Sequence, residues 1–175
     1  MEVFLNTLQF TLPSIVALAG ALLIVKSFID KETNLHKHEY VMKNQKTITP
    51  VRMQAYERII MFLERISPAG LISRVQESGM SAKHLQIVLL QQIRAEFEHN
   101  ISQQLYITDE SWELVKSSKE NLIRLINVAS KEMGPEATAF DLSGAILNVY
   151  LKVENPPIEV AVKKIKEEFY YNFIK

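Results

Sequence analysis

The chain opens with a long apolar stretch that is set apart from everything after it. No residue from Val3 to Val25 is charged, and the densest part of this stretch reads LPSIVALAGALLIV at residues 12–25. About 20 apolar residues are enough for a helix to cross a bilayer. The only charged side chain before the stretch is that of Glu2, whereas a secretory signal begins with a positive region. The pattern therefore predicts a retained transmembrane helix rather than a cleaved signal peptide.

After Pro50, apolar residues recur every three or four positions, which is typical of amphipathic helices, and strand-like alternation is absent. Proline and glycine interrupt the pattern at several points. Helices are expected over residues 51–66, 68–75, 81–105, 108–133, 141–150 and 158–175. The sequence thus predicts an all-α fold, with an N-terminal single transmembrane helix followed by a compact domain of about five to six helices.

Each expected helix has one apolar side. The helix over 81–105 carries an apolar series at every fourth position: Leu85, Leu89, Ile93, Phe97, Ile101 and Leu105. The helix over 108–133 gathers Trp112, Val115, Leu122, Ile126, Ala129 and Met133. The last helix gathers Ile158, Ala161, Val162, Ile165, Phe169 and Phe173, mostly opposite Lys163, Lys164, Glu167 and Glu168. Ser81, Thr108 or Asp109, and Asp141 are the expected residues at helix starts.

The pattern divides the chain into three parts. Residues 1–29 are expected to form a short tail and the transmembrane helix, residues 30–51 a polar juxtamembrane linker, and residues 52–175 a helical cytoplasmic domain. Pro50 is expected to mark the boundary, because proline biases the residue before it away from the helical conformation.

The basic residues orient the expected anchor. No lysine or arginine precedes the apolar stretch, and a series of them follows it: Lys26, Lys31, Lys37, Lys43, Lys46 and Arg52. The positive-inside rule then places the N-terminus outside and the C-terminal domain in the cytoplasm. The predicted localisation is the inner (cytoplasmic) membrane, as a single-pass protein.

The composition argues against several classes of function. The 20 basic and 20 acidic residues cancel, so no overall field attracts nucleic acid, and no nucleic-acid partner is expected. The chain has no cysteine, which removes disulfides and thiolate ligands. Its 5 glycines are scattered, so no glycine-rich loop is available to hold a phosphate. No cofactor is expected, and no catalytic constellation of residues is evident.

One polar group interrupts the helical pattern. The sequence EFEHN at 96–100 places Glu96 three residues before His99, the spacing of ligands on di-iron helices. Together with neighbouring polar residues, the pair forms a stripe on one side of the expected helix. We call this set the polar stripe: Gln92, Glu96, His99, Asn100 and Gln103.

Three interpretations of the polar stripe remain open. It is a solvated surface, a hydrogen-bonded layer that fixes the register of a neighbouring helix, or half of a metal site. The chain has four histidines, His36, His38, His84 and His99, and only the last has a glutamate three residues before it. A di-metal bundle requires two such helices and two further glutamates. The metal interpretation is therefore the weakest, and no metal is predicted.

Two blocks of sequence carry a resemblance to a known family. They are RMQAYERIIMFLERISP at 52–68 and EFEHNISQQLYITDESWELVK at 96–116. Together with the apolar N-terminus, they resemble a family of small bacterial single-pass membrane proteins of unassigned function. The resemblance covers most of the chain and implies a bacterial membrane protein. It implies no catalytic or binding role for any residue.

The sequence favours a membrane-anchored, non-enzymatic interaction or scaffold protein, or an accessory subunit of a membrane complex. Its expected partners are the lipid bilayer, through the N-terminal helix, and another membrane protein or complex, with a homo-oligomer left open. The alternative is a metal-dependent enzyme that uses Glu96 and His99.

Overall fold

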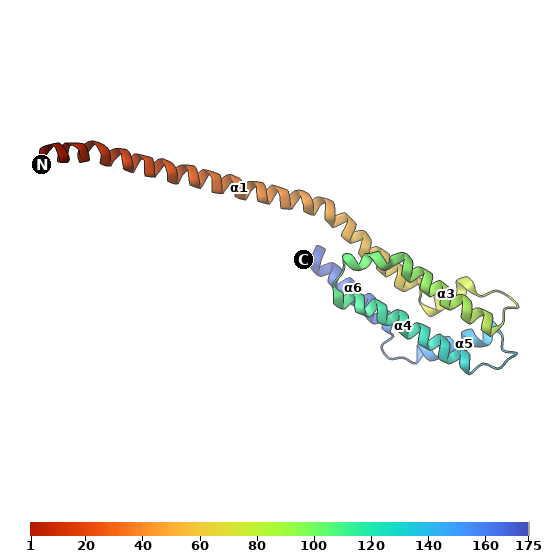
Figure 1. Ribbon diagram of the computed structural model, residues 1–175. Coiled ribbons are helices and arrows are strands. Elements are labelled where there is room, and N and C mark those ends of the chain that lie inside the picture. The colour runs from red at the N-terminus through yellow and green to blue at the C-terminus, as the bar shows by residue number, and fades with distance from the viewer. Residues whose placement is uncertain (175) are drawn as a thin grey trace. The chain divides into compact units, whose positions relative to one another are not determined.

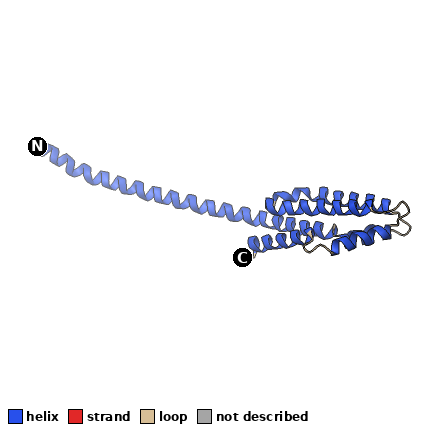
Figure 2. Cartoon of the chain, turned by 90° about the horizontal axis from the view of Figure 1, so that it is seen from below, coloured by secondary structure: helices blue, strands red, loops and turns tan. Residues whose placement is uncertain are grey.

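The computed structural model describes the backbone of residues 1–174 and the side chains of residues 1, 18, 20, 22–29, 31–32 and 45–174. Its elements are helices throughout this part of the chain (Figures 1 and 2). They are α1 (Glu2–Arg65), α2 (Pro68–Val75), α3 (Ala82–Asn100), the 3-10 helix η1 (Ile101–Leu105), α4 (Asp109–Lys131), α5 (Ala139–Leu151) and α6 (Pro157–Phe173).

The chain divides into two compact units, residues 1–49 and residues 50–175. The backbone of α1 is helical on both sides of this division, so no separate helix begins at residue 51, whereas the division of the chain into tail, linker and domain stays a prediction. Proline removes one helical hydrogen bond and disfavours the helical conformation of the residue before it, but a long helix can absorb both costs. The polar residues 30–51 belong to the same helix.

The prediction of a transmembrane helix is contradicted. In the described part of the chain, no helix has a stretch that is both long enough and apolar enough to cross a membrane. Within the predicted span, the side chains of residues 3–17, 19 and 21 lie outside the described residues. The predicted single-pass inner-membrane localisation and its orientation are contradicted by the same finding.

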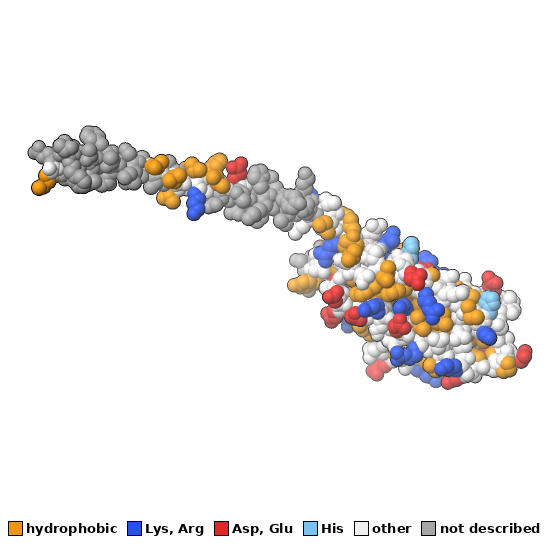
Figure 3. Space-filling model, in the orientation of Figure 1, with side chains coloured by type: hydrophobic (Ala, Val, Ile, Leu, Met, Phe, Trp, Pro, Cys, Tyr) orange, Lys and Arg blue, Asp and Glu red, His pale blue; other side chains and the backbone are white. Residues whose placement is uncertain are grey.

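The unit from Pro50 onward has its own apolar core. In it, α4 lies beside α3, α5 and α6, and α2 packs against α3 and α5 (Figure 1). The largest fully buried side chains come from several helices: Tyr56, Ile59, Phe62, Leu63, Ile66, Leu71, Leu85, Leu89, Ile93, Ile126, Leu142 and Ile146. One face of this unit shows basic and acidic side chains interspersed (Figure 3), in keeping with the cancelling charges of the sequence.

The apolar series of α3 ends earlier than its spacing predicts. Its first members are buried, but Ile101 is 46% exposed and Leu105 is 77% exposed. The α-helix ends at Asn100 and continues as the tighter 3-10 helix η1. Because a 3-10 helix has three residues per turn instead of 3.6, the series no longer points to the core.

The loops before α3 and α5 pair with each other. Ser81 and Thr138 form an isolated antiparallel bridge. The amide of Ala82 donates to the opposite loop at 2.9 Å, and the amide of Ala139 donates back at 2.9 Å. Each amide belongs to the first residue of its helix, where no intrahelical acceptor exists. Each loop therefore supplies an acceptor that the other loop's helix needs.

The two bridged helix starts are alike in sequence as well. Ser81 caps α3 and Thr138 caps α5, and Thr138 forms a capping box with Asp141. A buried alanine follows each cap, and a buried leucine lies three residues further on, at Leu85 and Leu142. This correspondence covers too few positions to stand out as a repeat in the sequence.

Candidate functional site

The polar stripe does not act as one layer. Gln92 and His99 are exposed, whereas Glu96 lies partly buried against α1. Its Oε1 accepts a hydrogen bond from Arg65 Nε at 2.8 Å and lies 2.6 Å from Arg65 Nη2. The carboxylate that was a candidate metal ligand is therefore engaged by a guanidinium.

The two buried members of the polar stripe form local contacts. Asn100 is 7% exposed and its Nδ2 donates to the backbone oxygen of Glu96 at 2.8 Å. Gln103 is 9% exposed and its Nε2 donates to Ser102 Oγ at 3.3 Å. These bonds support the end of α3 and the start of η1. A role of the polar stripe in partner contact stays a prediction.

The histidines are the residues that the metal interpretation of the sequence depends on. Among the described side chains, no three histidines or carboxylates are placed to hold a metal ion together. His36 and His38 lie outside the described side chains.

The Arg65–Glu96 pair is expected to contribute little to stability. Its side chains are 52% and 14% exposed, and double-mutant cycles on exposed pairs give roughly 0.2–1 kcal/mol. We expect a coupling energy in this range for a cycle of Arg65→Gln and Glu96→Gln, measured by urea denaturation. His99→Ala is the control and should change the free energy of unfolding by less than about 0.5 kcal/mol. A chelator that lowers the stability of the wild type would contradict this assignment.

A groove with a largely apolar lining runs along α6. It encloses about 760 Å³ between α6, the second half of α5 and the corner that joins α1 to α2. Apolar side chains supply much of its lining: Pro68, Ala69, Leu147, Leu151, Ile158 and Val162. We call it the α6 groove. A concave, mostly apolar depression with a few polar groups is the usual form of a binding site.

Polar side chains line the rest of the α6 groove. Two tyrosines contribute ring surface, Tyr150 from α5 and Tyr170 from α6. The charged members come from α1 and α6: Glu64, Glu159, Lys163, Lys166 and Glu167. Lys163 Nζ lies 4.0 Å from Glu167 Oε1. The groove is thus largely apolar and also carries both signs of charge.

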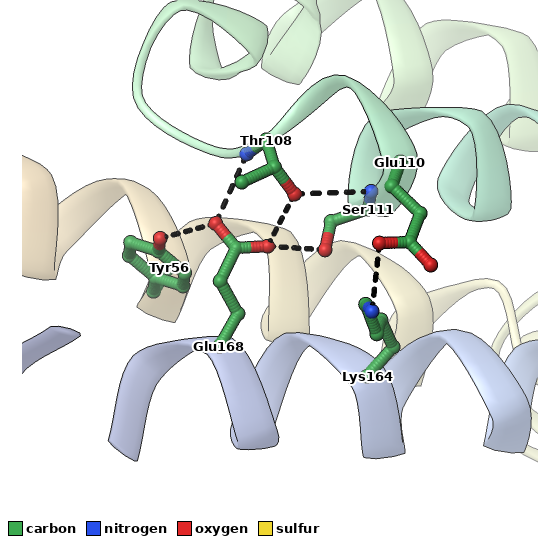
Figure 4. Close-up of polar contacts among 6 residues, drawn as sticks. All are labelled: Tyr56, Thr108, Glu110, Ser111, Lys164 and Glu168. Carbon is green, nitrogen blue, oxygen red and sulfur yellow. Dashed lines mark hydrogen bonds and ion pairs between the residues drawn. The ribbon is translucent and has the colours of Figure 1, made fainter. Parts of the chain in front are cut away.

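A partly buried set of hydrogen bonds fixes α6, the helix that forms the long wall of the groove. Glu168 of α6 accepts hydrogen bonds from Tyr56 Oη at 2.6 Å, Thr108 N at 3.0 Å, Thr108 Oγ1 at 2.7 Å and Ser111 Oγ (Figure 4). We call these four residues the Glu168 clasp. Tyr56 comes from α1, and the other two partners stand at the start of α4. One carboxylate therefore ties α6 to two other helices.

The surroundings of Glu168 favour its charged form. Burial by itself raises the pKa of this carboxyl, but the hydrogen bonds from Ser111, Tyr56 and Thr108 outweigh it and hold the pKa below its ordinary value. The position is also favourable because a negative charge at a helix N-terminus complements the helix dipole. The pKa of the Tyr56 phenol is raised, first by burial and then by its bond to Glu168.

Sequence reasoning placed Glu168 on the solvated side of the last helix, and it missed the clasp. Glu168 follows the buried Ile165 by three residues and the buried Ala161 by seven. These spacings put it on the buried face of a helix. A carboxylate at such a position was the signal available in the sequence, and its partners lie 57 to 112 residues away.

The fold and the groove define an all-helical protein with a preformed apolar groove on a folded unit. The chain belongs to a protein family described as a family of unknown function, DUF7935, whose profile matches residues 2–171. The resemblance to a family without assigned function is thereby confirmed. Neither a curated protein nor a solved structure matches the chain.

Proposed function

We propose that this chain is a non-catalytic interaction protein that binds an amphipathic helix of a partner protein in the α6 groove. The observation that carries the proposal is the groove itself, about 760 Å³ of mostly apolar surface between helices. Helix-in-groove recognition uses a surface of this kind, with apolar anchors of the bound helix at positions i, i+4 and i+7.

The dimensions of the α6 groove indicate the size of the bound helix. Its lining positions on α6 run from Ile158 to Tyr170. At 1.5 Å per residue, these positions span about 18 Å along the helix axis. A bound helix of about 12 residues, or three turns, matches this length.

The groove wall is fixed before a partner arrives, which favours binding. The Glu168 clasp holds the C-terminal part of α6, and Phe169 and Phe173 both pack edge-on against Tyr56, with ring centroids 5.6 Å apart in each pair. A site that is already ordered loses less conformational freedom on binding.

The metal-dependent alternative has no specific observation in its favour. Its two residues, Glu96 and His99, differ in their surroundings, since the first is paired with Arg65 and the second is exposed.

The test uses a labelled model peptide of about 12 residues, with leucines on one face and glutamines on the other. Its affinity for the full chain is measured by fluorescence anisotropy. Leu151→Glu places a charge among the apolar side chains that line the groove, at a residue that is 80% exposed, so folding should be retained. We expect this change to weaken binding by about tenfold or more, since burying an unpaired charge costs at least 1.4 kcal/mol.

Val149→Glu is the matched control. Val149 lies on the same helix, is 50% exposed and is not part of the groove lining. The control should bind the peptide as the wild type does. An equal loss in both variants, or no binding by the wild type, would contradict the proposal.

A further inference from the structure

We infer that the α6 groove selects a basic amphipathic helix, with a lysine or arginine of the partner placed between Glu64 and Glu159 beside Tyr150. This inference rests on the proposed function, because it specifies the partner of the same groove. It is carried by the arrangement of charge at one end of the groove.

Three helices bring polar groups to that end. Glu64 stands at the end of α1, Glu159 in the first turn of α6 and Tyr150 near the end of α5, and all three line the groove. The pKa of the Tyr150 phenol is raised by burial and then by the negative charges of Glu159 and Glu64. Both carboxylates therefore act on the same phenol, although their residues are far apart in the sequence.

Neither carboxylate is neutralised by the described side chains. The ion pairs found among these side chains involve other acids, and the nearest base along α6, Lys163, lies 4.0 Å from Glu167. The negative charge of Glu159 also complements the positive end of the α6 dipole, and this interaction stabilises the fold. Glu64 has no such role, since it lies at the opposite, negative end of its helix.

The sign of the charge therefore differs along the length of the groove. The end beside Tyr150 is acidic, while the bases Lys163 and Lys166 lie further along α6, with Glu167 next to them. Charge complementarity fixes which partner binds and in which register more than it adds affinity. A helix with an apolar face and a cation at one end matches this surface.

The experiment compares two labelled peptides with identical leucine faces. One carries lysines on its polar face and the other carries glutamates, and both are titrated with the full chain by fluorescence anisotropy. We expect the basic peptide to bind about five- to tenfold more tightly at low salt, an effect typical of partly exposed charge pairs. Raising the salt from about 50 mM to about 300 mM should reduce this ratio, because screening shortens the reach of exposed charges.

The double variant Glu64→Gln, Glu159→Gln should bring the ratio between the two peptides close to one. Glu154→Gln is the matched control, since Glu154 is exposed in the segment before α6 and does not line the groove. The control should keep the ratio of the wild type. A ratio that survives the double variant would overturn the inference.

Other outcomes separate this inference from the proposed function. Equal binding of both peptides by the wild type, with loss on Leu151→Glu, would overturn the basic preference and leave the groove as a binding site. If neither charged peptide binds, and the leucine and glutamine peptide does not bind either, both this inference and the proposed function would be overturned. Sedimentation equilibrium that shows a dimer dissociated by Leu151→Glu would make a second copy the occupant and would also overturn the inference.

Discussion

Replacing Glu168 with alanine is expected to lower the free energy of unfolding by roughly 2–4 kcal/mol, because several donors lose one charged acceptor. Tyr56 and Ser111 are 2% and 0% exposed, so water cannot easily replace the carboxylate at their hydroxyls. Urea denaturation followed by circular dichroism measures the loss. Glu167→Ala is the control on the neighbouring, exposed position, and it should cost less than about 0.5 kcal/mol. Equal losses in the two variants would show that the clasp contributes nothing specific.

The contribution of Glu168 should depend on pH in a defined direction. Because its folded-state pKa is lowered, the charged carboxylate stabilises the fold fully above the unfolded-state pKa of about 4.3 and stops doing so as the pH falls through the folded value. The stability difference between the wild type and Glu168→Gln should therefore be largest near neutral pH and should shrink with acidification below about pH 4. A difference that grows on acidification would mean that the pKa is raised instead.

Replacing Trp112 with alanine is expected to cost about 3–5 kcal/mol, the usual range for a large aromatic side chain in a core. Trp112 is 7% exposed, and its ring stacks on that of Phe97 with centroids 5.4 Å apart and planes at 21°. Phe97 in turn lies 5.9 Å from Phe62 and beneath Lys119 Nζ at 4.1 Å. Removing the indole therefore opens a cavity where α1, α3 and α4 meet.

Far-UV circular dichroism in urea measures this effect, since Trp112 is the only tryptophan and its fluorescence is lost in the variant. Phe140→Ala is the matched control, because Phe140 is 77% exposed at the start of α5. It should change stability by less than about 0.5 kcal/mol. A loss below about 1 kcal/mol for Trp112→Ala would show that the core closes around the gap.

The local features of the fold could be predicted from the sequence because they depend on neighbouring residues. The apolar face of α4 follows from helical spacing, and its members from Trp112 to Ala129 are buried. Ser81 and Thr108 cap their helices as expected, each by accepting a backbone hydrogen bond three residues ahead. The start of α5 was harder to locate, since Thr138 forms the cap and Asp141 completes the capping box.

The predictions that were wrong concern features that depend on contacts over long sequence distances or on how far a helix continues. The change from α3 to η1 removed Ile101 and Leu105 from the core, although their spacing fits an uninterrupted helix. The transmembrane assignment relied on the length of the uncharged stretch and on the charges beside it, and in the described part of the chain no helix is long and apolar enough to cross a membrane.

The candidate site was the part of the structure that the sequence predicted least well. The polar stripe was visible because its members share one helix, but its most defined contact joins Glu96 to Arg65, 31 residues away. The α6 groove combines residues of α1, α2, α5 and α6, so its shape exists only in the folded unit. The same is true of Glu168, whose neighbours along the chain reveal none of its donors.

The bridge between the two loops limits how this protein can be divided or recombined in evolution. A fragment that ended after α4 would keep α3 but would lose the acceptor for the amide of Ala82, and the complementary fragment would leave Ala139 in the same position. Neither the pair α3 and α4 nor the pair α5 and α6 therefore satisfies its own first amide, although the starts of α3 and α5 are alike in sequence. Gene fusions, insertions and split versions of the chain should be tolerated best when their junctions fall outside the segment from Met80 to Thr138.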